Sequence, residues 1–220
     1  MLYINTDTLL QYTEQGIRGL FPNTSFPEPF IPPEGYACVF PTPVPDHNPI
    51  IHRGQETTPE LTELGHWEQR WEIVSLFTEY TDENDVVHTV ESQWTQALVA
   101  DLEARRGTAR DAIKAERDRR KFNGVYVSGK WIHTDTYSRT QWMGMVMMGA
   151  GIPAIPWTTM DNTSITTSQA LAGAVFQATA TLDATLFAYA KSLIDQVDAS
   201  SEPQSIDIMT GWPTTFGEAP

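Results

Sequence analysis

The fold of the C-terminal half is decided by residues 124–133, which carry the sequence GVYVSGKWIH. Two short runs rich in β-branched and aromatic residues flank the pair Ser128-Gly129. Such runs form strands, and a two-residue connection containing glycine favours a tight hairpin turn. The sequence therefore predicts a β-hairpin over this stretch.

A short helix is predicted directly after the hairpin. Asp135 or Thr136 can cap its N-terminus, and Pro153 and Pro156 prevent it from continuing far beyond Met148. An adaptable binding surface is one role for its methionines, but we expect most of them to be core residues of a short buried helix. These residues are Met143, Met145, Met147 and Met148.

A second hairpin and the longest helix follow. Residues 157–160 and 163–166 flank the turn pair Asp161-Asn162, and Ser168 can cap a helix that extends to about Val197. Apolar side chains recur along that helix at spacings of three and four, so one face should pack on a core. These side chains are Leu171, Val175, Ala178, Leu182, Leu186, Tyr189, Leu193 and Val197.

The N-terminal part is rich in proline. Ten of the 15 prolines lie between Pro22 and Pro59, and proline lacks an amide donor and fixes φ, so this stretch cannot be a helix or a central strand. Strands are predicted at 36–40 and 67–74, and a short helix at 9–20. We expect a small antiparallel sheet, which is marginal by itself and needs a partner.

Between these parts, residues 92–123 predict a connector helix, with Ser92 as N-cap and a break or kink near Gly107. Its apolar stripe is narrow, which suits a coiled-coil seam better than a globular core. The predicted oligomerisation residues are Trp94, Leu98, Leu102, Ala109 and Ile113. The whole chain is thus predicted to be α+β: a proline-rich β domain (1–91), this connector, and two hairpins packed on two helices (124–220).

The charge is strongly acidic, with 28 acidic and 14 basic side chains and a net charge of −14. Residues 1–100 carry −12, residues 101–121 carry +3 and residues 122–220 carry −5. The basic island on the connector can bind an anionic partner, but we favour a helix with internal ion pairs, because its acidic flanks would repel nucleic acid. We therefore expect no nucleic-acid partner.

Other classes of protein are disfavoured by simple counts. The single cysteine, Cys38, excludes an intrachain disulfide and a multi-cysteine zinc site, and we expect it to be a buried small hydrophobe. No stretch approaches 18 uninterrupted apolar residues, and residues 1–7 do not resemble a secretion signal. We expect no membrane-spanning segment.

Catalytic motifs are missing from the sequence. It contains no nucleotide-binding glycine loop and no nucleophile elbow. His47 and His52, beside Asp46, can ligate a metal if the chain folds them together, but the histidines lack the spacing of a helical metal motif. We expect no catalytic residues, no metal and no cofactor.

Several landmarks follow one another in a recognisable order. They are the Arg/Lys-rich helix end, the hairpin, the helix of tryptophan and methionine, Pro156-Trp157-Thr158-Thr159, the alanine-rich helix, and Gly211-Trp212-Pro213. With these landmarks, the segment from Arg105 to Pro213 resembles the C-terminal domain of tailed-phage tail-fibre assembly proteins and related tail-fibre proteins. The N-terminal part is similar to the way such proteins begin, at Ile17-Arg18, 22–27 and 65–71.

The resemblance implies a non-enzymatic protein that works with the receptor-binding fibre, either as an assembly chaperone or as a structural component of the virion. It would be found in the virion tail or, during assembly, in the host cytoplasm. A fibre or baseplate protein is the expected partner, and a homo-oligomer is expected, with a trimer favoured because tail fibres are commonly trimeric. The alternative is a metal-dependent or hydrolytic protein that acts on a host-surface polymer.

Within this expectation, the partner-facing surface is assigned to the N-terminal domain. The candidate residues are Phe26, Pro41, Pro43, Pro45, Trp67 and Trp71. The alternative for the prolines is that they only stiffen surface loops.

Overall fold

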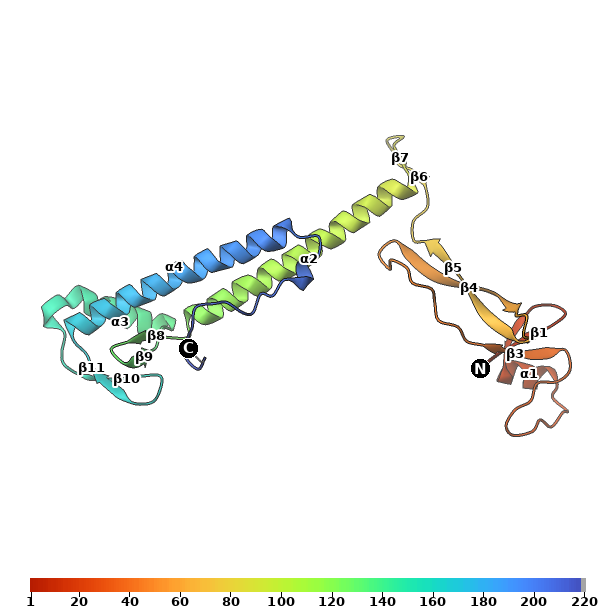
Figure 1. Cartoon of the computed structure of the whole chain (residues 1–220), viewed down its shortest axis with the longest axis horizontal. Coiled ribbons are helices and arrows are strands. Elements are labelled where there is room, and N and C mark those ends of the chain that lie inside the picture. Colours follow the sequence, from red (N-terminus) through yellow and green to blue (C-terminus); the bar gives the residue numbers. More distant parts are fainter. Residues whose placement is uncertain (219–220) are drawn as a thin grey trace. The chain divides into compact units, whose positions relative to one another are not determined.

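The computed structural model describes residues 1–218 and has an α+β fold, as predicted. The chain divides into two compact units, Met1–Val99 and Ala100–Pro220 (Figure 1). The boundary falls inside the helix α2 (Val90–Lys121), so the predicted connector region belongs partly to each unit.

The first unit contains a five-stranded sheet in the order β2-β1-β3-β5-β4. Its strands are β1 (Leu2–Asn5), β2 (Gln11–Thr13), β3 (Tyr36–Phe40), β4 (His52–Leu61) and β5 (Trp67–Ser75). Neighbouring strands are antiparallel except β3 and β5, which pair in parallel. The expectation of an antiparallel sheet was therefore wrong at this one pair, because the proline-rich segment after β3 and the strand β4 separate β3 from β5 along the chain. The expectation that the stretch from Pro22 to Pro59 contains no central strand was also wrong, because β3 lies in the middle of the sheet and its five residues include no proline.

A strand occupies part of the predicted helix 9–20. Gln11–Thr13 pairs with β1, and the helix α1 is confined to Glu14–Leu20. The Thr13 side chain accepts a hydrogen bond from the Gly16 amide at 3.1 Å, which fixes the helix start there. Ile17 on α1 is fully buried together with Tyr3 and Ile4 of β1.

The start of α2 also differs from the prediction. A small hairpin, β6 (Tyr80–Thr81) and β7 (Val87–His88), precedes it. The Thr89 hydroxyl accepts a hydrogen bond from the Ser92 amide at 3.2 Å, so Thr89 rather than Ser92 occupies the capping position. The helix then continues through Gly107 without the expected break.

The second unit follows the predicted order closely. The first hairpin, β8 (Val125–Val127) and β9 (Lys130–Ile132), turns at Ser128 and Gly129, whose φ values of 52° and 80° fit a type I′ turn. The remaining elements are α3 (Thr136–Met148), η1 (Gly149–Gly151), β10 (Pro156–Thr158), β11 (Ser164–Thr166), α4 (Gln169–Ala199) and η2 (Pro203–Ser205). Asp135, one of the two predicted candidates, caps α3, and Ser168 caps α4 as predicted.

The core of this unit has two parts, both built on α4. The first packs the N-terminal half of α4 against the first hairpin and α3: Val125, Val127, Ile132, Trp142, Leu171, Ala172 and Val175. The second packs its C-terminal half against α2 and the C-terminal segment: Ile113, Leu186, Ala190, Leu193, Val197 and Trp212. Figure 1 shows α4 running along the second half of α2. The later part of α2 is therefore a core element of this unit.

Ion pairs cover the basic part of α2, which confirms the favoured interpretation of that island. Most partners lie on the helix itself, as in Arg105–Asp101 at 2.7 Å and Arg106–Glu103 at 2.6 Å. Others lie elsewhere in the unit, as in Arg110–Asp198 at 2.6 Å. The basic side chains thus help to attach α2 to α4 and to the C-terminal segment.

The expectation for the methionines of α3 was wrong. Only Met145 packs against the core, whereas Met143, Met147 and Met148 are 48, 82 and 56% exposed. The reason is that α3 buries only Ser138 and Trp142, so most of its apolar surface faces outward.

Among the described residues, α4 alone is long and apolar enough to cross a membrane by length and composition. The core helix of a globular protein passes the same test, and α4 places seven buried residues in the two core clusters.

Candidate functional site

The proline-rich segment after β3 is held in place by Trp71 and Thr42. The Trp71 Nε1 donates a hydrogen bond to the Thr42 carbonyl at 3.0 Å, and the Thr42 hydroxyl donates one to the Gln69 carbonyl at 2.7 Å. The Thr42 amide in turn donates to Gln69 Oε1 at 3.3 Å. Residues 41–45 therefore lie against β5, and Pro41, Pro43 and Pro45 remain exposed.

Gly54 on β4 allows this close approach. A Cβ at Gly54 would collide with Cγ1 of Val44 and would touch the ring of Trp71. A larger residue at this position would push residues 41–45 away from the sheet.

A shallow hollow lies beside this segment, with a volume of about 530 Å³. It is lined by Thr57, Thr58, Pro59, Glu60, Leu61, Trp67, Arg70 and Trp71. The β4–β5 register shifts between Thr57 and Glu60, which marks a bulge at the hollow, and Arg70 forms an ion pair with Glu60. The structure thus brings Trp67 and Trp71 together on one surface that offers indole faces, hydroxyl groups and one ion pair.

Phe26 is not among the residues that line this hollow. It packs in a separate aromatic cluster, with its ring centroid 5.1 Å from that of Phe30 and 6.4 Å from that of Phe21. The Arg18 guanidinium lies 5.4 Å from the Phe26 ring and also pairs with Glu28. Phe26 therefore helps to hold its own loop.

The two histidines considered as metal ligands have other contacts. His47 Nδ1 lies 2.9 Å from the Pro45 carbonyl oxygen, and the His52 ring packs edge-to-face on Trp94 with centroids 5.1 Å apart. Within residues 1–218, no group of three or more histidine, cysteine or acidic side chains is placed to hold a metal ion.

Cys38 is half-buried rather than fully buried, so that expectation was only partly met. Burial raises the pKa of its thiol, which keeps the group protonated and weakly nucleophilic at neutral pH.

The predicted oligomerisation residues of α2 do not form one free stripe. Ile113 is fully buried among residues of α4, and Ala109 packs against the same cluster, so Ile113 is not available to a second copy. Trp94 donates a hydrogen bond from Nε1 to the Ser75 hydroxyl at 3.1 Å. Leu98 is 38% exposed and Leu102 is half-buried.

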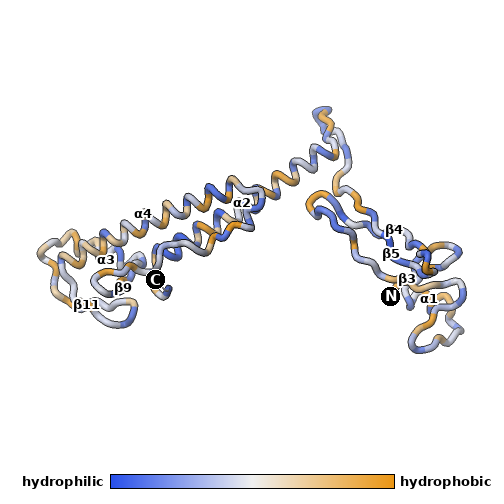
Figure 2. The backbone as a smooth tube through the Cα atoms, viewed as in Figure 1, coloured by the Kyte–Doolittle hydropathy of each residue, from blue (hydrophilic) through white to orange (hydrophobic). Residues whose placement is uncertain are grey.

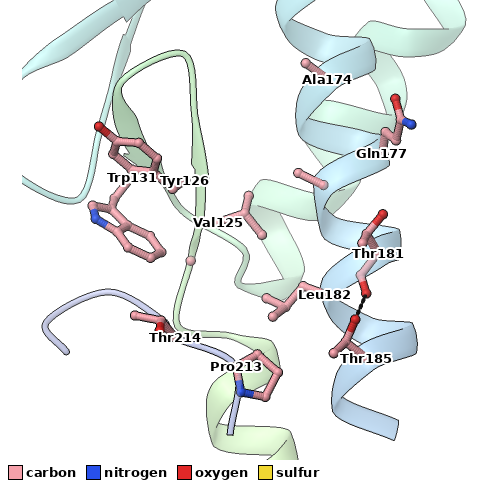
Figure 3. A pocket seen from close by; sticks show the side chains of 12 residues that line it. Val125, Tyr126, Trp131, Ala174, Gln177, Thr181, Leu182, Thr185, Pro213 and Thr214 are labelled. Carbon is pink, nitrogen blue, oxygen red and sulfur yellow. Dashed lines mark hydrogen bonds between the residues drawn. The ribbon is translucent and has the colours of Figure 1, made fainter. Parts of the chain in front are cut away.

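The second unit contains a groove that the sequence did not predict (Figure 3). Its volume is about 520 Å³. One wall is the first hairpin with Val125, Tyr126 and Trp131, the second is α4, and the third is the segment Pro213–Thr214. Along α4, Ala174, Gln177, Ala178, Thr181, Leu182 and Thr185 line it.

The groove offers aromatic contact and neutral hydrogen-bonding groups. Tyr126 is 61% exposed, and Trp131 is half-buried beside it with ring centroids 5.4 Å apart. The lining residues include no acidic or basic side chain. A sequence signal did exist, because small and hydroxyl residues recur on α4 at intervals of three and four between 174 and 185.

A carboxylate ties the two hairpins of this unit together. Asp161, in the turn between β10 and β11, accepts hydrogen bonds from the hydroxyls of Thr159 and Thr163 and pairs with Lys130 of β9 at 3.2 Å. The hydrogen bond from the Thr159 hydroxyl makes the largest contribution to holding the pKa of Asp161 well below its usual range, and the hydrogen bond from the Thr163 hydroxyl makes the next largest. The carboxylate therefore stays ionised and serves as a structural tie.

Comparison with known proteins gives one match. Residues 103–210 match a family model described as a domain of unknown function, DUF4376. The match begins in the later part of α2 and ends at Thr210, so it spans both hairpins, α3 and α4 of the second unit. No curated protein and no solved structure matches the chain.

Proposed function

We propose that this chain is a non-enzymatic tail-fibre-associated protein of a tailed phage. It acts by protein–protein contact with a fibre or baseplate protein, as a structural component of the virion tail or as an assembly chaperone, and it works in several copies, with a trimer favoured. The order of motifs from Arg105 to Pro213 and the N-terminal motifs support the assignment to this class.

The observation that carries the proposal is the surface formed by residues 41–45 and the tryptophan-lined hollow. An extended segment rich in proline is ordered before it binds, so it loses little conformational entropy on contact with a partner. Trp67 and Trp71 lie beside it, and tryptophan is enriched among the residues that dominate binding energy. Exposed Phe40 and Leu61, at 50 and 52%, add apolar area at the ends of β3 and β4.

Charge supports a protein partner with a basic or neutral surface. Residues 1–100 carry a net charge of −12, and complementary charge speeds encounter with a basic surface. Capture by this unit should therefore weaken as the salt concentration rises.

The test is capture of the fibre protein of the same phage by the tagged full-length chain, measured with Trp71→Ala and with substitutions of Pro41, Pro43 and Pro45. Loss of a central tryptophan should weaken capture about tenfold or more. Leu64→Ala is the matched control, because Leu64 lies in the β4–β5 turn, is 86% exposed and does not line the hollow. Unchanged capture in all the variants would refute the surface assignment.

The two roles are separated by mass spectrometry of purified virions. Stoichiometric copies in the particle indicate the structural role. Capture of the fibre combined with absence from the particle indicates the chaperone role. A chain that is absent from the particle and captures neither fibre nor baseplate protein is not a tail-fibre-associated protein.

A further inference from the structure

The outer face of the second half of α3 is apolar and uncovered in the single chain. Met143 and Met147 are one helical turn apart and lie on the same face, and Met147 is 82% exposed. Met148, 56% exposed, extends the apolar area, whereas Tyr137, 85% exposed, lies nearer the start of the helix beyond the exposed Thr140 and Gln141. Figure 2 shows hydrophobic residues gathered in the second half of this helix. Soluble monomers rarely expose contiguous apolar patches of this kind unless the patch binds something.

This face lies in a part of the chain that is almost free of charge. From Thr140 to Leu182 the only acidic or basic residue is Asp161, although the chain carries 42 charged side chains in total. Asp161 is occupied by Lys130 and two threonine hydroxyls. Depletion of charge and enrichment of methionine are properties of the buried centre of protein interfaces.

A hollow of about 300 Å³ adjoins the same face. It is lined by His133, Arg139, Thr140, Trp142, Met143, Phe176, Thr179, Ala180 and Asp183. Its two charged groups neutralise each other, since Arg139 donates to both oxygens of Asp183, at 2.7 and 3.0 Å. A cavity of about 150 Å³ already holds a benzene molecule, so this hollow can take one large apolar side chain.

We propose that this methionine face is the contact between copies of the chain, and that Met147 of one copy inserts into the hollow of the next. Each copy presents both the protruding side chain and the hollow, so the surface is complementary to a second copy of itself. Charge favours the same occupant: two chains of net charge −14 repel each other over most of their surface, and the stretch from Thr140 to Leu182 avoids that repulsion.

The inference rests on the multi-copy part of the proposed function and gives it an interface. It replaces the stripe on α2, because Ile113 is buried within the chain. Fibre capture is assigned to the other unit, so the two assignments can fail separately. A monomer that captures fibre overturns this inference and the multi-copy part of the proposed function, but leaves the fibre assignment intact. An oligomer that captures nothing overturns the fibre assignment alone.

The experiment is size-exclusion chromatography with light scattering on the full-length chain across a concentration series. Wild type is compared with Met147→Lys, which alters the inserted side chain, and with Ala180→Phe, which fills the hollow. Burial of one methionine corresponds to about a tenfold or greater change in dissociation constant, which both variants should show. Met209→Lys is the control, because Met209 is 59% exposed on the C-terminal segment and should leave assembly unchanged.

Circular dichroism and thermal unfolding establish that the variants are folded, which the exposure of Met147 and Ala180 favours. A wild type with the mass of one chain, 24.6 kDa, at all concentrations overturns the inference. So does assembly that survives both substitutions in folded protein. Dissociation by Met209→Lys as well would show that added positive charge, rather than this face, controls assembly, and would also overturn it.

Discussion

Replacing Arg120 by alanine should destabilise the second unit far more than replacing its neighbour Arg119. Arg120 is only 7% exposed, and its Nε donates to Glu116 Oε1 at 2.6 Å. Its Nη1 donates to Glu218 Oε2 at 2.8 Å and to the Pro213 carbonyl at 3.1 Å. The guanidinium therefore links α2 to the C-terminal segment at two points.

The size of the effect follows from burial. Removing one partner of a buried ion pair costs about 3–5 kcal/mol, because the remaining charge is left without compensation. Glu116 is 6% exposed, but Arg119 retains two hydrogen bonds to it, at 2.7 and 2.8 Å. We therefore expect the lower end, about 3 kcal/mol, which for a domain of this size lowers the Tm by about 12 °C.

Arg119→Ala is the matched control, since Arg119 contacts the same two carboxylates. Its side chain is 52% exposed, and exposed ion pairs contribute about 1 kcal/mol or less. The assay is thermal and urea unfolding followed by circular dichroism at 222 nm, where the helices dominate the signal. If Arg119→Ala destabilises the unit as much as Arg120→Ala, burial does not set the strength of this network and the reasoning is refuted.

Three further predictions concern the second unit. The hydrogen bonds from Arg119, and to a smaller extent the one from Arg120, hold the pKa of Glu116 below its ordinary value of 4.5. The stability that the Glu116 carboxylate contributes is therefore complete above pH 4.5, and it is lost as the pH falls through the lowered pKa of the folded protein. The Tm difference between wild type and Glu116→Gln should therefore shrink between about pH 7 and about pH 3, and a constant difference would contradict this. Asp135→Ala should cost about 1 kcal/mol in urea unfolding through loss of the α3 cap, with Asp135→Asn retaining most of the stability. Gly124→Ala should cost about 2 kcal/mol or more, because Gly124 has a φ of +85° and a Cβ would collide with Met160 Sδ; an unchanged Tm would show that the turn relaxes.

Elements with strong local signals were predicted well from the sequence. The turn at Ser128-Gly129 needs two residues with positive φ, and Asp135 and Ser168 each accept hydrogen bonds from amides of the first helical turn. These preferences act within four residues, so the sequence contains all the information they require. The same reasoning failed at Ser92 because Thr89, three residues earlier, could cap equally well.

Features that depend on distant parts of the chain were not predictable in this way. The second half of α3, residues 142–148, contains only apolar residues and one glycine, so it has no polar face to indicate which methionines point outward. The hydrogen bond from Trp71 to Thr42 joins residues that are 29 positions apart. The burial of Ile113 under α4 joins residues that are more than 70 positions apart. Trp67 and Trp71, four residues apart and on the same face of one strand, were grouped correctly in advance.

The buried ion pairs also help to hold one wall of the groove in the second unit. Pro213 and Thr214 form its third wall, and the Pro213 carbonyl is held by Arg120 while Trp212 packs in the α2–α4 core. Asn123 fixes the following residues, since its Nδ2 donates to the Phe216 carbonyl at 2.8 Å and its carbonyl accepts from the Phe216 amide at 3.0 Å. The Trp131 and Phe216 rings, with centroids 6.1 Å apart, join the segment to the hairpin wall. Any ligand that uses all three walls must therefore bind more weakly to Arg120→Ala than to Arg119→Ala, even at temperatures where both variants remain folded.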